Sequence, residues 1–195
     1  MKKFSYASLA AATLLGAGLL TGRLTAQNGT TDCDDRITSG GWIVTSFGST
    51  ANFGAHGGLD PSDPSQLKGN LNYVHREVDL HVVAQDVSGY CRCPGPNECR
   101  RITYHDAKVN YAGVQMICDV FVEVCDLGEP PIEDTFSICI PCIGYCQSGV
   151  LGGDNKPSGG NIQLHASDPG CPQVPVCEVL LEEACTCLTQ CVAGP

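Results

Sequence analysis

The residues with the clearest capacity for chemistry in this sequence are its fourteen cysteines. Thiolates can bind zinc or an iron–sulfur cluster, carry out thiol–disulfide exchange, or be consumed in structural disulfides. The even count and an apparent export signal favour disulfides at all fourteen positions. The cysteines are Cys33, Cys91, Cys93, Cys99, Cys118, Cys125, Cys139, Cys142, Cys146, Cys171, Cys177, Cys185, Cys187 and Cys191.

Metal and redox chemistry of these sulfurs are weakly supported. The Cys-x-x-Cys spacing occurs once, at Cys139 and Cys142, and Cys146 follows four residues later. A zinc or iron–sulfur site usually has paired knuckles, and a c-type haem needs a histidine directly after the motif. A redox motif places its first thiol at a helix N-terminus, whereas Cys139 ends an alternating strand pattern. We therefore expect no metal and no cofactor.

The disulfide pairing cannot be derived from the sequence, because fourteen cysteines allow very many pairings. One pair is suggested by the chain between Val114 and Ile140, which contains two runs of strand-forming residues. If this hairpin folds about Pro130, Cys118 and Cys142 lie equally far from its tip. We therefore predict a bond between them.

No catalytic constellation is recognisable. The five histidines are spread over separate segments, and no serine elbow, zinc-protease helix or phosphate-binding loop is present. Glu133 and Asp134 flank a turn, where acidic residues are common. The protein is therefore not expected to be an enzyme. The histidines are His56, His75, His81, His105 and His165.

Residues 1–26 resemble a secretory signal peptide, with Lys2 and Lys3 before an apolar stretch that runs to about Leu20. Cleavage after Ala26 would leave 169 residues with 8 basic and 21 acidic side chains, a formal charge of −13. This charge disfavours nucleic acid and anionic membrane surfaces as partners. An uncleaved N-terminal anchor is the alternative, and no membrane span is expected in the mature chain.

The remaining chain is patterned mostly with period two. In the Val114–Ile140 hairpin, alternate residues of the first run are apolar, and Pro130 and Pro131 occupy the connection. Ile37–Thr45 predicts another strand, in which Gly40 and Gly41 indicate a bulge or a close backbone approach. Trp42 is predicted to fill the core, and His81 to face solvent.

Eight or so short strands with glycine- and proline-rich connections predict an all-β antiparallel sandwich over residues 27–166. Residues 167–195 form a cysteine-rich tail. From Pro175 to Cys191 its apolar residues recur at helical spacing, which predicts a short amphipathic helix. A disordered tail is the alternative.

The motif order in this domain resembles the post-COAP-1 domain, a module of secreted and surface bacterial proteins. The motifs are ITSGGWI, ANFG, GNLNYV, DLGEPPIEDTFSI, SGVLGG and GGNIQLH, and they run from about Ile37 to His165. The resemblance implies an all-β extracellular building or adhesion module without assigned catalytic residues. The chain differs from the family pattern by its inserted cysteines and its cysteine-rich tail.

These observations lead to three hypotheses on function. The first is a secreted, disulfide-stabilised structural or adhesive subunit of an extracellular matrix, fibre or cell-surface layer, whose partners are copies of itself or other matrix or surface proteins. In this hypothesis exposed sheet edges pair between subunits. The second is a monomeric module that binds carbohydrate or calcium through the loops at Asp60–Asp63 or Asp126–Asp134. The third, a thiol oxidoreductase, requires free or reactive thiols.

Overall fold

The computed structural model describes residues 34–94, 98–128, 133–151, 158–167, 171 and 173–177. These residues form ten strands and two single-turn 3₁₀ helices. The elements are β1 (Arg36–Val44), β2 (Thr50–Asp60), β3 (Asp63–His75), η1 (Arg76–Val78), β4 (Leu80–Ala84), β5 (Asp86–Arg92), β6 (Cys99–Tyr111), β7 (Val114–Cys125), β8 (Thr135–Ile140), η2 (Pro141–Ile143), β9 (Tyr145–Val150) and β10 (Gly159–His165). The predicted all-β, antiparallel class is confirmed.

All ten strands belong to one hydrogen-bonded sheet with the order β10-β1-β2-β3-β4-β6-β7-β8-β9, and β5 pairs with β6 beside β4. The long strand β6 pairs with two strands along the same edge: its first half pairs with β5 and its second half with β4. A register shift between Tyr104 and Ala107 separates the halves on the β7 side. β-Bulges of this kind bend a strand and increase its twist.

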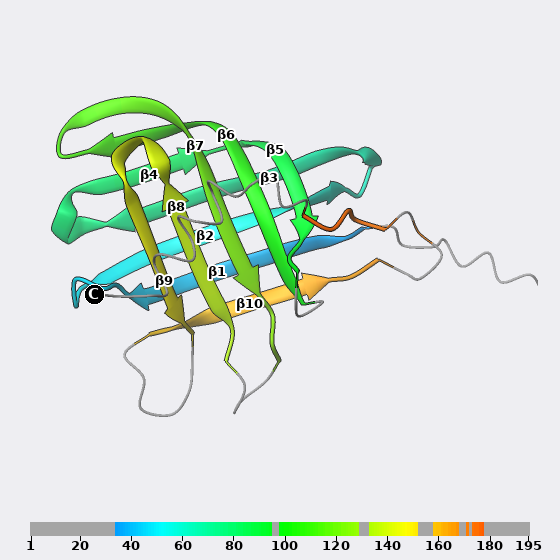
Figure 1. The fold of residues 1–195 in the computed structure, drawn as a ribbon. Helices are drawn as coiled ribbons and strands as arrows, with labels where there is room; N and C mark the ends of the chain where they lie inside the picture. The colour runs from blue at the N-terminus through cyan, green and yellow to red at the C-terminus, as the bar shows by residue number, and fades with distance from the viewer. Residues whose placement is uncertain are drawn as a thin grey trace, which may run out of the picture. The chain divides into compact units, whose positions relative to one another are not determined.

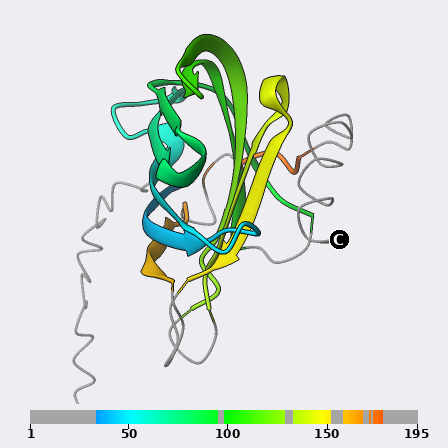
Figure 2. The ribbon, with the colours of Figure 1, turned by 90° about the vertical axis from the view of Figure 1, so that its left-hand side faces the viewer.

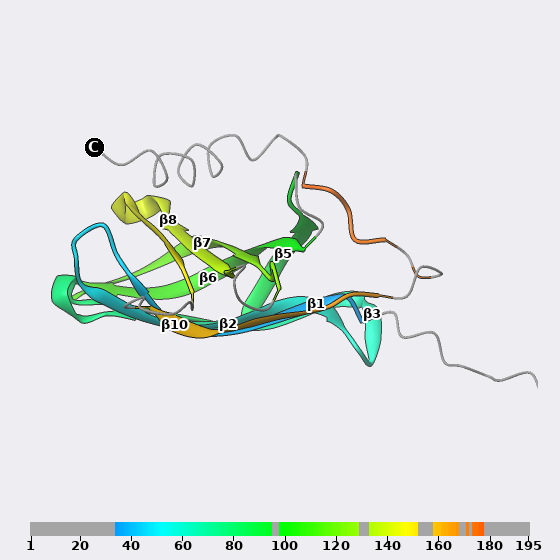
Figure 3. The same ribbon diagram turned by 90° about the horizontal axis from the view of Figure 1, so that it is seen from below.

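The sheet curls over on itself, so that β10, β1, β2 and β3 form one layer and β6 to β9 form the facing layer (Figures 1, 2 and 3). The prediction of about eight strands was too low. The strands also form one continuous sheet in the described residues, so the division into two sheets that defines a sandwich is not seen.

Aromatic rings connect the two layers. Phe136 on β8 stacks on Phe53 of β2 with a ring-centroid distance of 3.8 Å, and it lies 6.2 Å from the ring of Tyr73 on β3. All three side chains are buried in the main hydrophobic core. Burial of side chains of this size stabilises by about 1.5–3 kcal/mol each, so this contact is a main reason for the sheet to fold over.

The hairpin of β7 and β8 has the register that was predicted. Phe121 pairs with Cys139 and Val124 with Phe136, which are positions equally far from residue 130. On β7, Val120, Val122 and Val124 face the core. The period-two pattern therefore identified both the strands and the buried face of this element.

Three further predictions can be compared with the fold. Trp42 is 42% exposed, so its predicted place in the core was wrong; its ring covers Gly159 on the neighbouring β10. His81 is exposed, as predicted. The first residues of the predicted C-terminal helix, Pro175–Cys177, are extended, and Val176 forms a parallel bridge with Arg92 of β5.

The remainder of that predicted helix and the predicted signal peptide lie outside the described residues.

The predicted close backbone approach at Gly41 is confirmed. Gly41 of β1 pairs with Gly160 of β10, and a Cβ atom on Gly41 would overlap the carbonyl oxygen of Gly159 and the Cα atom of Gly160. By contrast, a Cβ atom on Gly54 of β2 would meet no atom within 4 Å. Glycine is therefore required at position 41 by space and not by its dihedral angles.

Replacement of Gly41 by alanine tests this packing. We expect Gly41→Ala to lower the free energy of unfolding by about 1–3 kcal/mol, because β1 and β10 would be forced apart. The matched control Gly54→Ala should unfold like the wild type or slightly later, since alanine restricts the unfolded chain. Urea unfolding followed by circular dichroism measures both. Equal midpoints for the two variants would contradict the close approach.

Candidate functional site

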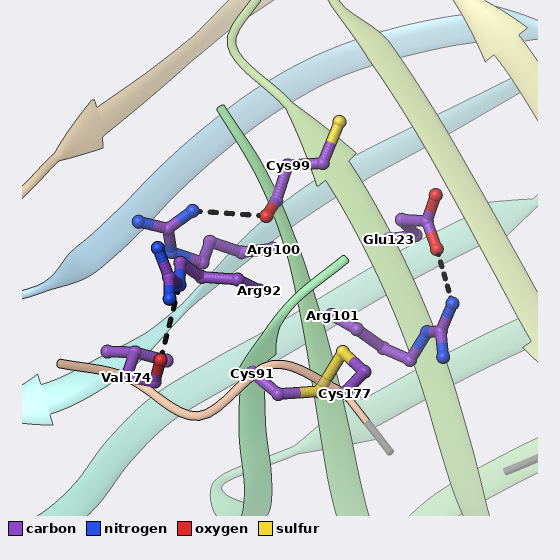
Figure 4. Close-up of a disulfide and its surroundings, with 8 residues drawn as sticks. All are labelled: Cys91, Arg92, Cys99, Arg100, Arg101, Glu123, Val174 and Cys177. Carbon is purple, nitrogen blue, oxygen red and sulfur yellow. Dashed lines mark hydrogen bonds and ion pairs between the residues drawn. A yellow bond between two sulfur atoms is a disulfide. The ribbon is translucent and has the colours of Figure 1, made fainter. Parts of the chain in front are cut away.

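The cysteines cluster on the strands from β5 onward, and three bonds are defined there. Cys99 and Cys125 are paired residues of β6 and β7 and form a disulfide. Cys91 on β5 is bonded to Cys177, which joins the segment 173–177 to the sheet (Figure 4). These bonds tie neighbouring elements at one end of the molecule.

The predicted bond between Cys118 and Cys142 is confirmed. It links β7 to η2, directly after β8. Because the hairpin register is symmetric about residue 130, the two cysteines face each other once the hairpin has formed. This pair could be found from sequence because both cysteines belong to one local element.

The Cys-x-x-Cys motif is split between different partners. Cys142 is bonded to Cys118, whereas Cys139 is a paired neighbour of Cys146 on β9, with the two sulfurs 2.8 Å apart. Cys139, Cys146 and Cys171 are all disulfide-bonded. Cys139 is fully buried within β8 and is not at a helix N-terminus. This arrangement lacks the activated thiol pair that a redox enzyme uses.

Cys93 differs from the expectation that all cysteines are bonded, since its thiol is free and buried. It packs with Cys99, Cys125 and Cys177 in a small cluster. Burial, followed by the negative charge of Glu123, raises the pKa of the Cys93 thiol to about 12. At neutral pH the thiol is therefore protonated and a poor nucleophile. Nothing in the spacing of the cysteines distinguishes this one from its neighbours.

Two buried arginines lie beside this cluster. The Arg100 guanidinium donates to both carboxylate oxygens of Asp35, at 2.9 and 2.8 Å, and the Tyr90 hydroxyl donates to the same carboxylate at 2.8 Å. Burial lowers the pKa of Arg100, but the hydrogen bonds and charge of Asp35 outweigh it, and the net shift is upward. Arg101 pairs with Glu123 at 2.8 Å. Each cation is thus neutralised locally.

The segment 173–177 continues the sheet beyond β5. The Arg92 amide donates to the Pro175 carbonyl at 2.9 Å, and the Cys177 amide donates to the Arg92 carbonyl at 2.8 Å. The Arg92 side chain donates through Nε to the Val174 carbonyl at 3.2 Å (Figure 4). Together with the Cys91–Cys177 bond, these contacts cover part of the β5 edge.

In the two acidic loops considered for carbohydrate or calcium, aspartate carboxylates accept hydrogen bonds from the protein itself. The Asp134 carboxylate accepts hydrogen bonds from the Leu127 and Ile162 amides, at 3.1 and 3.0 Å. Asp126 accepts from the Leu164 amide at 2.8 Å. These two carboxylates therefore bind the β7–β8 connection to the outer edge of β10, where none of the ten described strands supplies acceptors.

The other acidic loop is similar. Asp60 accepts from the amide and hydroxyl of Ser62, and Asp63 from those of Ser65. Such contacts are the local hydrogen bonds of Asx turns. Within the described residues, no group of three or more histidine, cysteine, aspartate or glutamate side chains is arranged to hold a metal ion.

A buried polar chain was not predicted. His75 Nε2 is 2.6 Å from the Ser49 hydroxyl, His75 Nδ1 is 2.8 Å from the Tyr145 hydroxyl, and that hydroxyl is 2.6 Å from the Tyr73 hydroxyl. The His75 side chain is completely buried, and burial lowers its pKa. The alternation of Leu71, Tyr73 and His75 on β3 was the available signal, because it places the histidine on the core face.

A serine and a histidine at hydrogen-bonding distance resemble a nucleophile and its base. Here the second imidazole nitrogen contacts a tyrosine hydroxyl, and the ring of Phe47 packs on His75 with a centroid distance of 5.8 Å. The chain of hydrogen bonds supplies partners for polar groups inside the core, which is what buried polar side chains require. The geometry therefore fits a structural role.

The other histidines do not converge. His81 Nε2 lies 3.0 Å from Asn72 Oδ1, and His105 Nδ1 lies 2.6 Å from the Asp119 carboxylate. His56 is on β2, and desolvation together with Arg36 and Lys68 lowers its pKa. The scattered placement predicted from the sequence is confirmed for these residues.

The comparisons with known proteins return no relative: no protein family, no curated protein and no solved structure matches the chain. Among the described residues, no helix is both long and apolar enough to span a membrane.

The carboxylate contacts to β10 can be tested with Asp134→Asn, which keeps the size of the side chain but removes its charge. Hydrogen bonds to charged groups contribute about 1.5–3 kcal/mol, so we expect a clear loss of stability. Amide hydrogen exchange at Ile162 should accelerate more than exchange in β2. Asp86→Asn, at an exposed position of β5, is the control and should behave like the wild type. Unchanged exchange at Ile162 would contradict the proposed role of Asp134.

The buried imidazole of His75 predicts a pH dependence. The unfolded chain has the ordinary histidine pKa of 6.5, whereas burial lowers the His75 pKa in the folded state. The unfolded chain therefore binds more protons as the pH falls below 6.5, and this contribution to stability, present above 6.5, is lost toward pH 5. His75→Gln should show a shallower dependence of the unfolding midpoint between pH 7 and 5. The exposed His81→Gln is the control and should keep the wild-type slope.

Proposed function

We propose that the protein is a secreted, disulfide-stabilised structural or adhesive subunit of an extracellular matrix, fibre or cell-surface layer. The observation that carries this proposal is the use of sulfur as cross-links along β5 to β9. Intramolecular disulfides are typical of extracellular proteins. In this proposal residues 1–26 direct export, and the post-COAP-1 resemblance reflects a shared extracellular building role.

The energetic argument concerns durability. Each bridge can stabilise by about 2–4 kcal/mol through restriction of the unfolded chain, although the contributions are not additive. The protein already has an extensive core that includes the stacked Phe53 and Phe136 rings. The additional cross-links are therefore best explained by resistance to heat, proteases or mechanical load. The two facing layers then act as one sandwich-like block.

The sheet edges differ in their suitability for pairing between subunits. On β10, the amides of Ile162 and Leu164 are bound to carboxylates, and the segment 173–177 pairs with the end of β5. Strand β9 is at the opposite end of the sheet from β10, and it pairs with β8. We therefore assign strand addition between subunits to β9.

Assembly can be measured by analytical ultracentrifugation and electron microscopy of the exported protein, with and without reductant. We expect oligomers or fibres that are lost in Val150→Lys, because a charged lysine on an edge strand opposes strand addition. Val114→Lys, at another exposed valine, is the matched control and should assemble like the wild type. Monodisperse single particles of the wild type under both conditions would contradict the proposal.

Non-reducing peptide mapping of the same exported protein tests the proposed secretion and the disulfide bonds together. The Cys91–Cys177, Cys99–Cys125 and Cys118–Cys142 peptides should be recovered as bonded pairs, from a chain that begins after Ala26. A fully reduced chain that retains its first residues would be incompatible with the proposed secretion.

A further inference from the structure

Five cysteines gather at the open end of the β6–β7 hairpin. Cys93, Cys99, Cys125 and Cys177 are buried in one cluster, and Cys91 packs against it. The Cys99–Cys125 and Cys91–Cys177 bonds use four of these cysteines (Figure 4). Within the described part of the chain, the Cys93 thiol has no disulfide partner. A thiol that lies beside a disulfide can react with it by thiol–disulfide exchange.

The strand register places Cys93 directly opposite Cys99. Arg92 pairs with Arg100 at the end of β5, so the next residue, Cys93, faces Cys99 at the start of β6. The Cys93 amide donates to the Cys99 carbonyl at 3.3 Å, in agreement with this register. Opposed residues that are joined by such hydrogen bonds have Cα atoms about 5.5 Å apart. A disulfide spans this separation, so a Cys93–Cys99 bond can form on the existing backbone.

Cys99 is opposed by a second cysteine on its other side, because it pairs with Cys125 of β7. Opposed residues of neighbouring strands project from the same face of a sheet. Cys93, Cys99 and Cys125 therefore form one row across three strands. Displacement at sulfur needs the attacking, the attacked and the leaving sulfur in line. A row that runs across the strands provides this order, with Cys99 in the middle.

The Cys91–Cys177 bond does not offer the same arrangement. Cys177 follows Val176, which forms the bridge with Arg92 at the end of β5. Its partner Cys91 is in β5, two residues before Cys93. If Cys93 attacked Cys177, the leaving sulfur would lie on the side of the attacking residue and not opposite to it. The register therefore favours Cys99–Cys125 as the bond that exchanges.

We propose that Cys93, Cys99 and Cys125 form an internal thiol–disulfide exchange site, in which the bond of Cys99 moves between Cys125 and Cys93. The Cys93 thiolate attacks Cys99 Sγ, the Cys99–Cys125 bond breaks, and its electron pair leaves with Cys125. Hydroxide takes the proton of the Cys93 thiol, and water returns a proton to Cys125. One disulfide and one thiol are present before and after the step, so no oxidant or reductant is consumed.

The exchange changes which elements are joined by sulfur. The Cys99–Cys125 bond closes the open end of the β6–β7 hairpin, whereas a Cys93–Cys99 bond ties β6 to the end of β5. The released end of β7 leads directly into Asp126, whose carboxylate holds the Leu164 amide of β10. The site is thus a switch between two cross-linked forms. It does not depend on the proposed assembly at β9, because it uses different strands.

The surroundings of the Cys93 thiol keep the exchange slow at neutral pH. The charged side chains that face the thiol are Glu123 of β7 and Arg101 and Arg100 of β6, and the segment 173–177 contains no charged residue. Burial and then Glu123 raise the pKa of the Cys93 thiol to about 12, although the two arginines oppose this shift. Only the thiolate attacks, so the exchange rate should rise about tenfold for each pH unit below this pKa.

Thiol mapping of the exported, oxidised protein tests the site. The wild type is held at pH 7 or pH 9 without added thiol and is then denatured at pH 5 with N-ethylmaleimide, which tags free thiols while exchange is suppressed. At pH 7 we expect the tag on Cys93. At pH 9 the tag should appear on Cys125 about 100-fold faster, together with an equal share of a Cys93–Cys99 peptide.

Two serine variants separate the proposed row from the other disulfides. Cys125→Ser leaves Cys99 without its present partner, so a Cys93–Cys99 bond should form and neither residue should be tagged. Cys142→Ser is the matched control, because it also removes one bond but leaves Cys118 outside the row. Its Cys93 and Cys118 thiols should both be tagged. If Cys125→Ser does not fold, the mapping of the wild type at pH 9 decides.

Three results would overturn the proposal. The first is a wild type that gains no tag on Cys125 at pH 9, and the second is a folded Cys125→Ser variant in which Cys93 and Cys99 are both free. The third is a Cys93 that is recovered in a bond with a cysteine beyond Cys177, because the attacking thiol is then missing. Cys93→Ser should keep the Cys99–Cys125 bond at both pH values, and a tag on its Cys125 would contradict the role of Cys93.

Discussion

The fold depends on the hydrogen bonds that hold β10, the strand at one end of the continuous sheet, along its outer edge. Strand β10 covers the outer edge of β1 and adds Ile162 to the core, yet no strand of the described residues pairs with its own outer edge. Asp126 and Asp134 replace that strand by accepting hydrogen bonds from the β10 backbone. Because both carboxylates lie next to the β7–β8 hairpin, the same contacts hold the two facing layers together at this end. Asp126 and Asp134 thus help to hold the folded-over sheet in place.

The two halves of the sheet are stabilised by different means. From β1 to β4 the chain contains no cysteine, and this half relies on the aromatic stack, close glycine packing and the buried polar chain at His75. From β5 onward, disulfides link adjacent elements. The buried Arg100–Asp35 pair connects the halves, since Asp35 precedes β1 and Arg100 is on β6.

The local features of this fold could be predicted from the sequence, but its long-range features could not. Period-two alternation identified β7 with its buried face, and the hairpin symmetry identified the Cys118–Cys142 bond. The continuity of the sheet escaped prediction because it depends on the pairing of β4 with β6 across the intervening β5. Trp42 was misplaced because alternation is weak beside Gly40 and Gly41. The contacts of Ser49 with His75 and of Asp134 with Ile162 join distant segments, and residue spacing does not encode them.

The bond between Cys91 and Cys177 closes a covalent ring that contains β6 to β10. A protease that cuts the backbone once anywhere inside this ring, for example in the connections after β7 or β9, cannot release a fragment, because both pieces stay attached through sulfur. The molecule would also keep its strand pairing on either side of the cut. A single proteolytic cut would therefore produce a nicked but intact protein, whose cleavage becomes visible only after reduction.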